Sequence, residues 1–363
     1  MFQAVLGTYG LRAEKCKIEP FGSGLINHTW KVCHEGSAYI LQEVNKAVFH
    51  HPQHIAQNIR AIKAYLDQTA AGYLFIAPIK ALNGDDFVVV NNHFYRIFPF
   101  VAHSCSVDFV QQPEQAYQAA KQFGQFTRML RAFDVQKLKP TIEDFHNLPL
   151  RVVQFKKALA KAGNEKIKEA KFAIEEIIRH DNIEAQYAQL VSSGALYLRV
   201  VHHDTKISNV LLQAETGVGL CVIDLDTVMP GYFISDVGDM MRTYLSAANE
   251  EESDLNKIVI REDVFAAIYK GYMEEMDQVL TFTEKQFFIY SGKFMIYMQA
   301  VRFISDFLNG DIYYKTNYPK HNLVRGLNQI DLLNKYTAKQ SEFEEIIKKI
   351  NENRVNEAKT IWS

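Results

Sequence analysis

The chain has 363 residues, of which 48% are apolar, 23% charged and 12% aromatic, and its formal net charge at pH 7 is −2. This composition is typical of a globular protein that buries a sizeable core, and the length predicts two lobes or two domains. The near-neutral charge, without a basic stripe, argues against a broad nucleic-acid surface, whereas a small anionic substrate held by a few groups is compatible with it.

The cysteines lie far apart and form no CxxC pair, which disfavours a zinc ribbon or a disulfide framework and favours a reducing compartment. They are Cys16, Cys33, Cys105 and Cys221. No run of about eighteen apolar residues could cross a bilayer, and the N-terminus does not read as a signal peptide. We therefore expect a cytoplasmic protein with no membrane partner. The oligomeric state is left open, and a monomer is plausible.

Residues 1–100 read mostly as strands. The segments "TWKVCH" and "AYILQEV" flank residues 35–37, and "DFVVV" and "HFYRIFPF" flank the asparagine pair 91–92, which tolerates positive φ. Both arrangements predict β-hairpins. Between them, apolar residues recur at helical spacing in 52–68. These are Ile55, Ile59, Ile62 and Leu66. We expect a β-rich lobe with one helix laid on an antiparallel sheet.

From about residue 113 the pattern changes to helices. Charged or amphipathic helical segments are predicted over 113–133, over 151–180 with a break near Gly163, and over 256–280 and 284–308. Residues 101–363 are therefore predicted to form a mainly helical lobe. The fold class that we expect is α+β and bilobal.

A short island of strands interrupts the helical half. "ALYLRVV" leads into "VHHDTKISN" at residues 201–209, and "NVLLQ" and "GLCVIDL" then flank a turn. Folding this hairpin about the Thr216–Gly217 bond places Asn209 opposite Asp224. The fold-back brings Asp204 to the same end of a small sheet, so the three polar side chains are predicted to lie together.

The spacing of these three residues resembles that of the H-R-D-x-x-x-x-N loop and D-F-G aspartate of kinases. In phosphoryl transfer one carboxylate accepts the proton of the attacking hydroxyl, while an amide oxygen and a second carboxylate hold Mg²⁺. We predict that Asp204 is the catalytic base and that Asn209 and Asp224 are metal ligands. A His-His-Asp metal site is an alternative, but adjacent residues leaving a strand point in opposite directions. His202 is instead expected to brace the loop, with His203 packing nearby.

Lys206 follows the base by two residues and is predicted to neutralise charge on the transferring phosphoryl group; a solvated loop lysine is the alternative. Gly22, Ser23 and Gly24 lie between two strand-like stretches, where small residues let backbone N–H groups approach phosphate oxygens. The alternative for this G-x-G is an ordinary tight turn. The segment 96–101 is predicted to be a hinge whose backbone meets adenine at Phe98 and Phe100, although Pro99 could equally belong to a plain linker.

Taken together, these segments resemble the aminoglycoside phosphotransferase-like, choline-kinase-like branch of the protein-kinase fold. "YILQEVN", "VFHHPQHIAQNI", "TIEDFHNLP", "HHDTKISN", "VIDLDTVMPG", "DVGDMMRT" and "RFISDFLNGDIYYKTNYPKHNLVRGLNQ" are similar to the N-acetylhexosamine 1-kinase group and span nearly the whole chain. The resemblance implies ATP, Mg²⁺ and phosphorylation of the anomeric hydroxyl of N-acetylglucosamine or N-acetylgalactosamine, with Asp226 on the sugar side.

One position departs from the family pattern. The strand "AYILQEV" should carry the lysine that pairs with the α- and β-phosphates, and this sequence has Gln42 there, followed by Glu43. Gln42 can donate hydrogen bonds to the nucleotide but carries no charge. Lys46 or Lys31 could substitute for the missing lysine.

Arg302 and Asp306 are four residues apart on a predicted helix that Gly310 ends. They could form a surface pair, although arginine before aspartate is the poorer orientation for that purpose. Together with Tyr313 they also suit a sugar, whose hydroxyls need directional partners and whose ring faces need flat apolar ones. We predict that all three contact the acceptor.

Two other functions remain open from the sequence. One is a kinase for choline, homoserine or an aminoglycoside; a choline site needs an aromatic cage and carboxylates, and an aminoglycoside site needs many carboxylates. The other is a kinase relic that binds nucleotide or sugar without turnover. The presence of Asp204, Asn209 and Asp224 argues against the relic, and Gln42 argues slightly for it.

Overall fold

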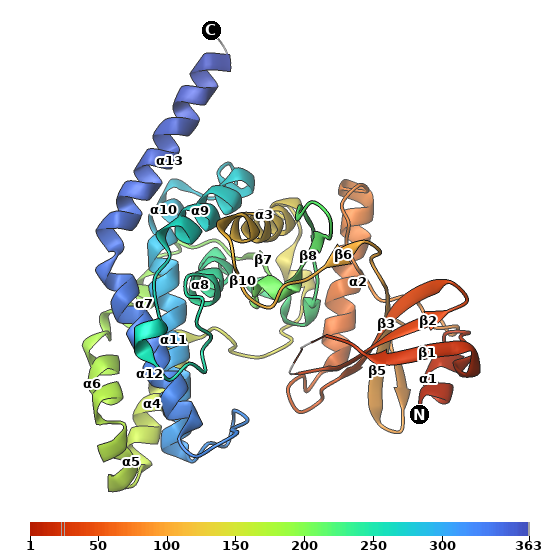
Figure 1. Cartoon of the computed structure of the whole chain (residues 1–363), viewed down its shortest axis with the longest axis horizontal. Helices are drawn as coiled ribbons and strands as arrows, with labels where there is room; N and C mark the ends of the chain where they lie inside the picture. Colours follow the sequence, from red (N-terminus) through yellow and green to blue (C-terminus); the bar gives the residue numbers. More distant parts are fainter. Residues whose placement is uncertain (23, 25, 362–363) are drawn as a thin grey trace.

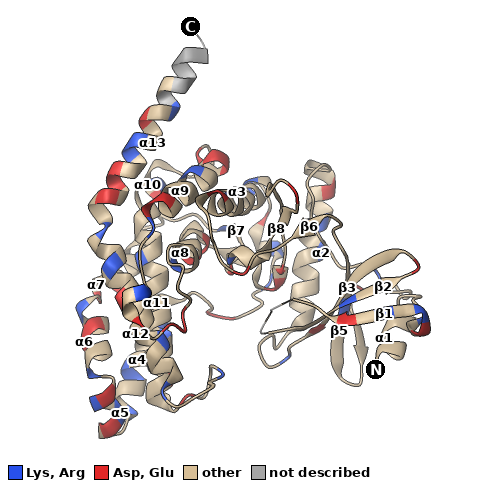
Figure 2. Cartoon of the chain, viewed as in Figure 1, with Lys and Arg blue, Asp and Glu red and all other residues tan. Residues whose placement is uncertain are grey.

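The computed structural model describes residues 1–22, 24 and 26–361. The chain folds into a β-rich N-terminal lobe and a larger, mainly helical C-terminal lobe (Figure 1). This arrangement confirms the bilobal α+β prediction. Within the described residues, no helix is both long enough and apolar enough to cross a membrane. Figure 2 shows that acidic and basic residues intermingle along the helices, as in α6 and α13.

The N-terminal lobe is built on an antiparallel five-stranded sheet in the order β1-β2-β3-β5-β4. Its elements are α1 (Phe2–Gly7), β1 (Cys16–Pro20), β2 (His28–His34), β3 (Ser37–Val44), β4 (Val88–Val90) and β5 (His93–Pro99). Both predicted hairpins are confirmed. Their turns use positive φ at Glu35 (48°), Asn91 (51°) and Asn92 (65°), in line with the turn chemistry that the sequence indicates.

The two faces of this sheet pack against different partners, because side chains alternate along each strand. Val32, Leu41 and Ile97 form a small core with Val5 and Leu6 of α1. The sequence did not predict this N-terminal helix. The opposite face, which carries Gln42 of β3, is directed toward the helical lobe.

Helix α2 (Pro52–Thr69) contains the predicted apolar stripe, and all four of its members are buried. These side chains join the main core of the C-terminal lobe rather than the small N-terminal core. Asn58 anchors the helix there by donating to the carbonyl oxygens of Lys139 (2.8 Å) and Val228 (3.0 Å). The prediction of a helix laid on the sheet is therefore only partly right: α2 also bridges to the helical lobe.

The C-terminal lobe surrounds one long buried helix, α11, which contacts α4, α8 and α12. The helices are α3 (Pro113–Met129), α4 (Leu148–Lys161), α5 (Asn164–Glu169), α6 (Lys171–Arg179), α7 (Asn182–Ser192), α8 (Phe233–Tyr244), α9 (Glu262–Met276), α10 (Phe282–Gln286), α11 (Phe288–Asn309), α12 (His321–Ala338) and α13 (Gln340–Ile361). The predicted break near Gly163 is confirmed, but a second break at Ala170 divides the rest into two short helices.

Helix α8 lies very close to α11, and a glycine makes this possible. A Cβ at Gly238 would come within 2.3 Å of the backbone oxygen of Ser291. Any side chain at this position would push the helices apart. The close approach fixes α8 beneath the short strands described next.

Five short strands complete the C-terminal lobe. They are β6 (Ser104–Cys105), β7 (Arg199–Val201), β8 (Val210–Gln213), β9 (Gly219–Val222) and β10 (Met229–Gly231). Strands β6, β8 and β9 form one sheet, and β7 pairs with β10. The loops that join β7 to β8 and β9 to β10 contain the polar residues singled out by the sequence.

Candidate active site

The β8–β9 hairpin brings the predicted site residues to one end, but in a register that differs by one residue from the prediction. The backbone N–H of Ile223 donates to the carbonyl of Asn209 at 2.9 Å, so Ile223 rather than Asp224 lies opposite Asn209. The turn accounts for the difference: Gln213 pairs with Val218, so the hairpin folds about residues 215 and 216, one position earlier than predicted, and the register shift between Leu211 and Leu212 restores part of the offset. Asp224 follows directly after this pair.

Asp204, the predicted base, is held by its own loop. The Nδ2 of Asn209 donates to its backbone oxygen (2.9 Å) and to its carboxylate Oδ2 (3.1 Å). The Nζ of Lys206 lies 3.2 Å from Oδ1. Burial opposes ionisation of Asp204, but the surrounding positive groups, Lys206 first among them, together outweigh it and lower the pKa of the carboxyl. Asp204 is therefore an ionised acceptor at neutral pH.

Asp224 has a left-handed backbone (φ 58°, ψ 59°) shortly after the end of strand β9 at Val222. The side chain is exposed to solvent. Desolvation by the surrounding protein, with the charges of Asp226 and Asp204, raises its pKa to about 7. Carboxylates crowded in this way need a cation to be stable when ionised.

Asn209 and Asp224 offer donors that suit Mg²⁺. Because the Asn209 nitrogen is committed to Asp204, its amide oxygen is directed elsewhere and is free to bind a metal. Amide and carboxylate oxygens are hard ligands, and Mg²⁺ completes its shell with waters and phosphate oxygens. The described residues thus fit the magnesium role, which stays a prediction.

The two histidines of the motif do not form a metal site. His202 Nε2 is hydrogen-bonded to the carbonyl of Ile223 (2.9 Å), and His203 Nδ1 to that of Thr227 (3.1 Å). The described part of the chain holds no group of three His, Cys, Asp or Glu side chains suited to a metal ion. Desolvation lowers the pKa of His203 to about 4, so the ring is neutral. Both histidines lie where the bracing interpretation expects them.

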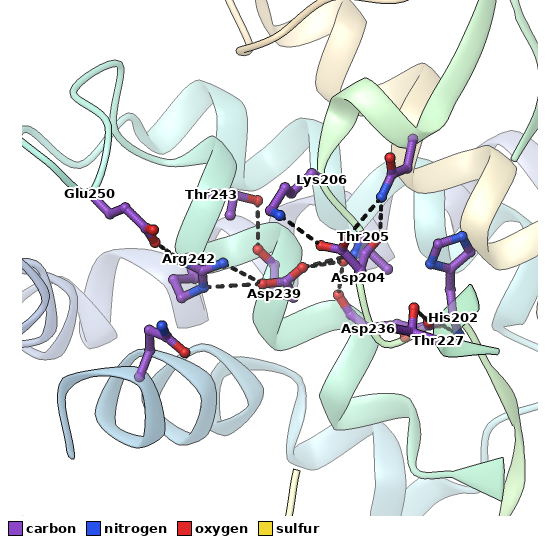
Figure 3. A network of polar contacts seen from close by, with 12 residues as sticks. His202, Asp204, Thr205, Lys206, Thr227, Asp236, Asp239, Arg242, Thr243 and Glu250 are labelled. Atoms are coloured by element: carbon purple, nitrogen blue, oxygen red, sulfur yellow. Dashed lines mark hydrogen bonds and ion pairs between the residues drawn. The ribbon is translucent and has the colours of Figure 1, made fainter. Parts of the chain in front are cut away.

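Two buried carboxylates on α8 hold the catalytic loop, as Figure 3 shows. Asp236 accepts hydrogen bonds from the backbone N–H groups of His202 (2.9 Å) and His203 (2.7 Å). Asp239 accepts from the N–H of Thr205 (2.8 Å) and is paired with Arg242 (2.9 Å). Burial is the main reason why the pKa of Asp236 is raised to about 7.

Sequence reasoning gave neither aspartate a role. Their signal is present in "FISDVGDMM", where two carboxylates three residues apart interrupt an otherwise apolar segment that becomes α8. Buried charges in such a helix require strong partners, and here the partners are the backbone N–H groups of the catalytic loop. A search for unexplained charges in apolar helices would have found them.

Arg302 lies among aromatic rings close to this loop. Its guanidinium is 5.4 to 5.9 Å from the ring centres of Phe145, Tyr313 and Tyr314, within the range of cation–π attraction. Phe145 stacks on His146 (4.4 Å), whose ring meets that of His203 edge-on (5.1 Å). These contacts place Arg302 and Tyr313 on the helical side of the catalytic loop.

Asp306 does not pair with Arg302 in the described structure, and its oxygens are already occupied. They accept from the backbone N–H groups of residues 312, 313 and 314 (2.9 to 3.1 Å) and from Asn322 Nδ2 (3.0 Å). A carboxylate has about four acceptor sites, and four donors fill them. Asp306 therefore positions the loop that carries Tyr313, and its contact with the acceptor stays a prediction.

The predicted nucleotide residues lie in the N-terminal lobe. Gly22 (φ 81°) and Gly24 follow β1 and have open space where a Cβ would be, whereas Ser23 lies outside the described residues. Phe98 lies on β5 two residues after Arg96, the cross-strand partner of Gln42. It therefore shares a sheet face with Gln42. The backbone N–H of Phe100 donates to the carbonyl of Ala38 (3.1 Å), and the contact of this segment with adenine stays a prediction.

Gln42 is bound to a residue that the sequence analysis did not single out. Arg96, its partner across β5, donates to Gln42 Oε1 from Nε (3.2 Å) and Nη2 (2.8 Å). Its Nη2 also lies 2.6 Å from Asp226 Oδ1. Asp226 Oδ2 accepts from Asn27 Nδ2 (2.8 Å). Asp226, predicted to face the sugar, thus joins the two lobes, and its sugar contact stays a prediction.

Comparison with solved structures shows a shared fold. A microcompartment-associated aminopropanol kinase aligns over 94% of this chain and 97% of its own (TM-score 0.62, 13% identity), and an Alicyclobacillus acidocaldarius aminoglycoside phosphotransferase over 97% and 95% (TM-score 0.59, 13% identity). A spectinomycin phosphotransferase, solved with ADP and spectinomycin, aligns over 93% and 96% (TM-score 0.58, 13% identity). The fold is thus the protein-kinase-like one of these phosphotransferases.

The family itself is shown by the sequence. Residues 17–262 match the model of the phosphotransferase enzyme family, and this span is well over half of the chain. It contains the glycine-containing loop, the β5 strand, the catalytic loop and helix α8. This protein therefore belongs to the phosphotransferase enzyme family, whose members phosphorylate small molecules.

Proposed function

We propose that this phosphotransferase is an ATP-dependent kinase that transfers the γ-phosphoryl group to the anomeric hydroxyl of N-acetylglucosamine or N-acetylgalactosamine. The products are ADP and a sugar 1-phosphate. The proposal combines the family with the sequence resemblance to N-acetylhexosamine 1-kinases, which reaches into 302–329 of the helical lobe. A further consideration is the presence of four free thiols, which fits an enzyme of the cytoplasm.

The catalytic loop supplies the groups that this transfer needs. Asp204 accepts the proton of the attacking hydroxyl and orients it, and its lowered pKa keeps it ready to accept. Asn209 and Asp224 would hold Mg²⁺, which neutralises charge on the phosphates when bound. Lys206, paired with Asp204, lies near enough to balance negative charge at the same point.

The charge on the acceptor side is the observation that carries the choice of substrate. Arg302 lies against the rings of Phe145, Tyr313 and Tyr314, so these aromatic faces already hold a cation. A second guanidinium lies nearby, since burial and then the charge of Arg302 lower the pKa of Arg151. A site with two cations repels choline and aminoglycosides and accepts a neutral sugar.

Two acidic residues of this region are committed to other cations. Glu250 is paired with Arg242 (2.8 Å), and Glu251 with Arg325. A neutral acceptor can use the remaining donors through its hydroxyl and amide oxygens, while the tyrosine rings cover a sugar face. Kinases of cationic alcohols need the opposite arrangement, with free carboxylates toward the acceptor.

The test is ATP consumption with a panel of acceptors, followed by phosphorus NMR of the product. We expect turnover with N-acetylhexosamines and with a 6-deoxy analogue, none with the methyl glycoside, and none with choline, homoserine or an aminoglycoside. Turnover of the methyl glycoside would place the phosphate elsewhere on the ring. Turnover of choline alone would overturn the sugar assignment, and no ATP consumption with any acceptor would favour the kinase relic.

A further inference from the structure

The position of Gln42 leaves the nucleotide phosphates without their usual lysine, and the sheet offers another cation on the same face. Strand register places Thr29, Gln42 and Arg96 side by side across β2, β3 and β5. Residues directly opposite each other on neighbouring strands point to the same side of a sheet. That side is opposite to the small core under α1, so all three point toward the helical lobe.

Arg96 differs from every other lysine and arginine of the N-terminal lobe. Among the described residues 1–100 it is the only buried cation, with 4% of its surface exposed. Lys46 bonds to Asn92 Oδ1 (3.2 Å) at a turn, and Lys31 lies over the ring of Phe100 (4.0 Å), nearer the hinge. Burying a guanidinium costs free energy of desolvation, which only strong partners offset. A buried arginine is therefore a candidate for a specific role.

The usual partner of the missing lysine is absent as well. In protein kinases that lysine pairs with a glutamate of the helix beside the sheet. The corresponding helix here, α2, has a single carboxylate, Asp67, and it is bonded to Lys63 (2.6 Å). Arg96 instead takes its carboxylate from the C-terminal lobe, at Asp226.

This pair lies at the predicted metal site. Asp226 is two residues after Asp224, so the ion pair lies beside the predicted metal ligand. Gln42 and Asp226 engage Nε and Nη2 of Arg96, whereas Nη1 makes no hydrogen bond to a described residue. The guanidinium is thus fixed in orientation with one nitrogen still able to donate, which is the arrangement that phosphate recognition requires.

We propose that Arg96 supplies the cation that binds the α- and β-phosphates of ATP, and that Gln42 and Asp226 act as positioning residues for its guanidinium. The inference rests on the proposed function, because it assumes that ATP is bound. A cross-strand arginine and glutamine share the role that a single lysine has in related kinases. Because Asp226 belongs to the other lobe, the same ion pair also couples the phosphate site to the relative position of the lobes.

The test measures binding of ATP, ADP and adenosine by calorimetry, with Mg²⁺ present. Arg96→Gln alone would leave Asp226 as a buried, unpaired carboxylate and could prevent folding. The informative comparison is therefore Asp226→Asn against the double variant Arg96→Gln/Asp226→Asn, because the two differ only in the arginine. Lys46→Gln, which removes a surface charge from the same lobe, is the matched control.

We expect the double variant to bind ATP and ADP about tenfold to a hundredfold more weakly than Asp226→Asn, with adenosine affinity unchanged. Lys46→Gln should bind all three ligands as the wild type does. Equal ATP affinity in the two Asp226 variants, or a loss of adenosine binding as large as that of ATP, would overturn the role of Arg96. Wild-type protein that binds no ATP would instead refute the proposed function on which the inference rests.

Discussion

The side-chain nitrogen of Asn209 holds Asp204 at two points, its backbone oxygen at 2.9 Å and its carboxylate at 3.1 Å. One amide therefore sets both the shape of the catalytic loop and the direction of the predicted base. The same contact commits the Asn209 nitrogen to Asp204 and leaves its amide oxygen for the predicted metal. The predicted base and the predicted metal ligand are thus oriented by a single contact.

Replacing Asp204 by Asn should abolish most of the turnover and leave the fold intact. The new amide can still face Asn209 through its oxygen, but it cannot accept the proton of the hydroxyl. We expect kcat to fall on the order of a hundredfold or more. Steady-state kinetics and the melting temperature together check this, and near-wild-type turnover in a folded variant would remove Asp204 from the mechanism.

Magnesium-dependent nucleotide binding should weaken as the pH falls below about 7, because Asp224 must be ionised to bind the metal and its pKa is raised to about 7. Above this pH the affinity should level off. Calorimetric titration of Mg-ATP from pH 5.5 to 8.5 checks the profile. Asp224→Ala should lose the Mg²⁺-dependent part of binding at every pH, and unchanged binding in that variant would exclude Asp224 as a ligand.

The same shift predicts the effect of Asp224 on the stability of the nucleotide-free protein. A carboxyl whose pKa is higher in the folded state than its ordinary 3.8 destabilises the fold once it ionises. Asp224→Asn should therefore raise the melting temperature above that of the wild type at pH 8. The difference should shrink as the pH falls from about 7 to 4, and a constant difference would contradict the shift.

Asp236→Asn should loosen the catalytic loop from α8. Each carboxylate oxygen accepts one backbone N–H, and an amide would turn an N–H₂ group toward one of these donors. We expect a loss of about 1–3 kcal/mol in the free energy of unfolding, together with a lower kcat. Denaturant unfolding checks the first. Asp67→Asn on the surface of α2 is the control and should change neither quantity appreciably.

Arg302→Met should raise KM for the sugar and leave KM for ATP unchanged, because the guanidinium lies on the acceptor side among three rings. Arg302→Lys keeps the charge but not the planar group, so it should recover only part of the affinity. Initial rates with each substrate varied in turn separate the two constants. A change confined to KM for ATP would move Arg302 to the nucleotide side.

Local sequence determined the hairpins, the α2 stripe and the end of α11 at Gly310. Asparagines at 91–92 adopt the positive φ that a two-residue turn needs, and Gly310 takes φ 99° after the last turn of the helix. Each of these features depends on residues close together in the chain. For the same reason the catalytic loop could be located from its spacing and from the strands on either side.

Only the tertiary structure decided which side chains meet across long distances. The β8–β9 turn folds one position earlier than predicted and the irregularity at Leu211–Leu212 restores only part of the offset, so Ile223 rather than Asp224 lies opposite Asn209. The sequence singled out Asp306 for the acceptor, and the structure adds that its carboxylate accepts hydrogen bonds from the loop of residues 312–314. Its donors are backbone N–H groups, which every sequence carries and which no motif reveals.

Arg96 and Asp226 illustrate the same limit at the nucleotide site. They are 130 positions apart in the printed sequence. Neither lies on β3, the strand where the family pattern places the phosphate-binding lysine. Sheet register places Arg96 beside Gln42, and lobe packing brings Asp226 to within 2.6 Å of it. Sequence determined the kinds of groups present and their local geometry, because those follow from neighbours along the chain. The pairing of charges was decided by packing, because it depends on which surfaces the fold brings together.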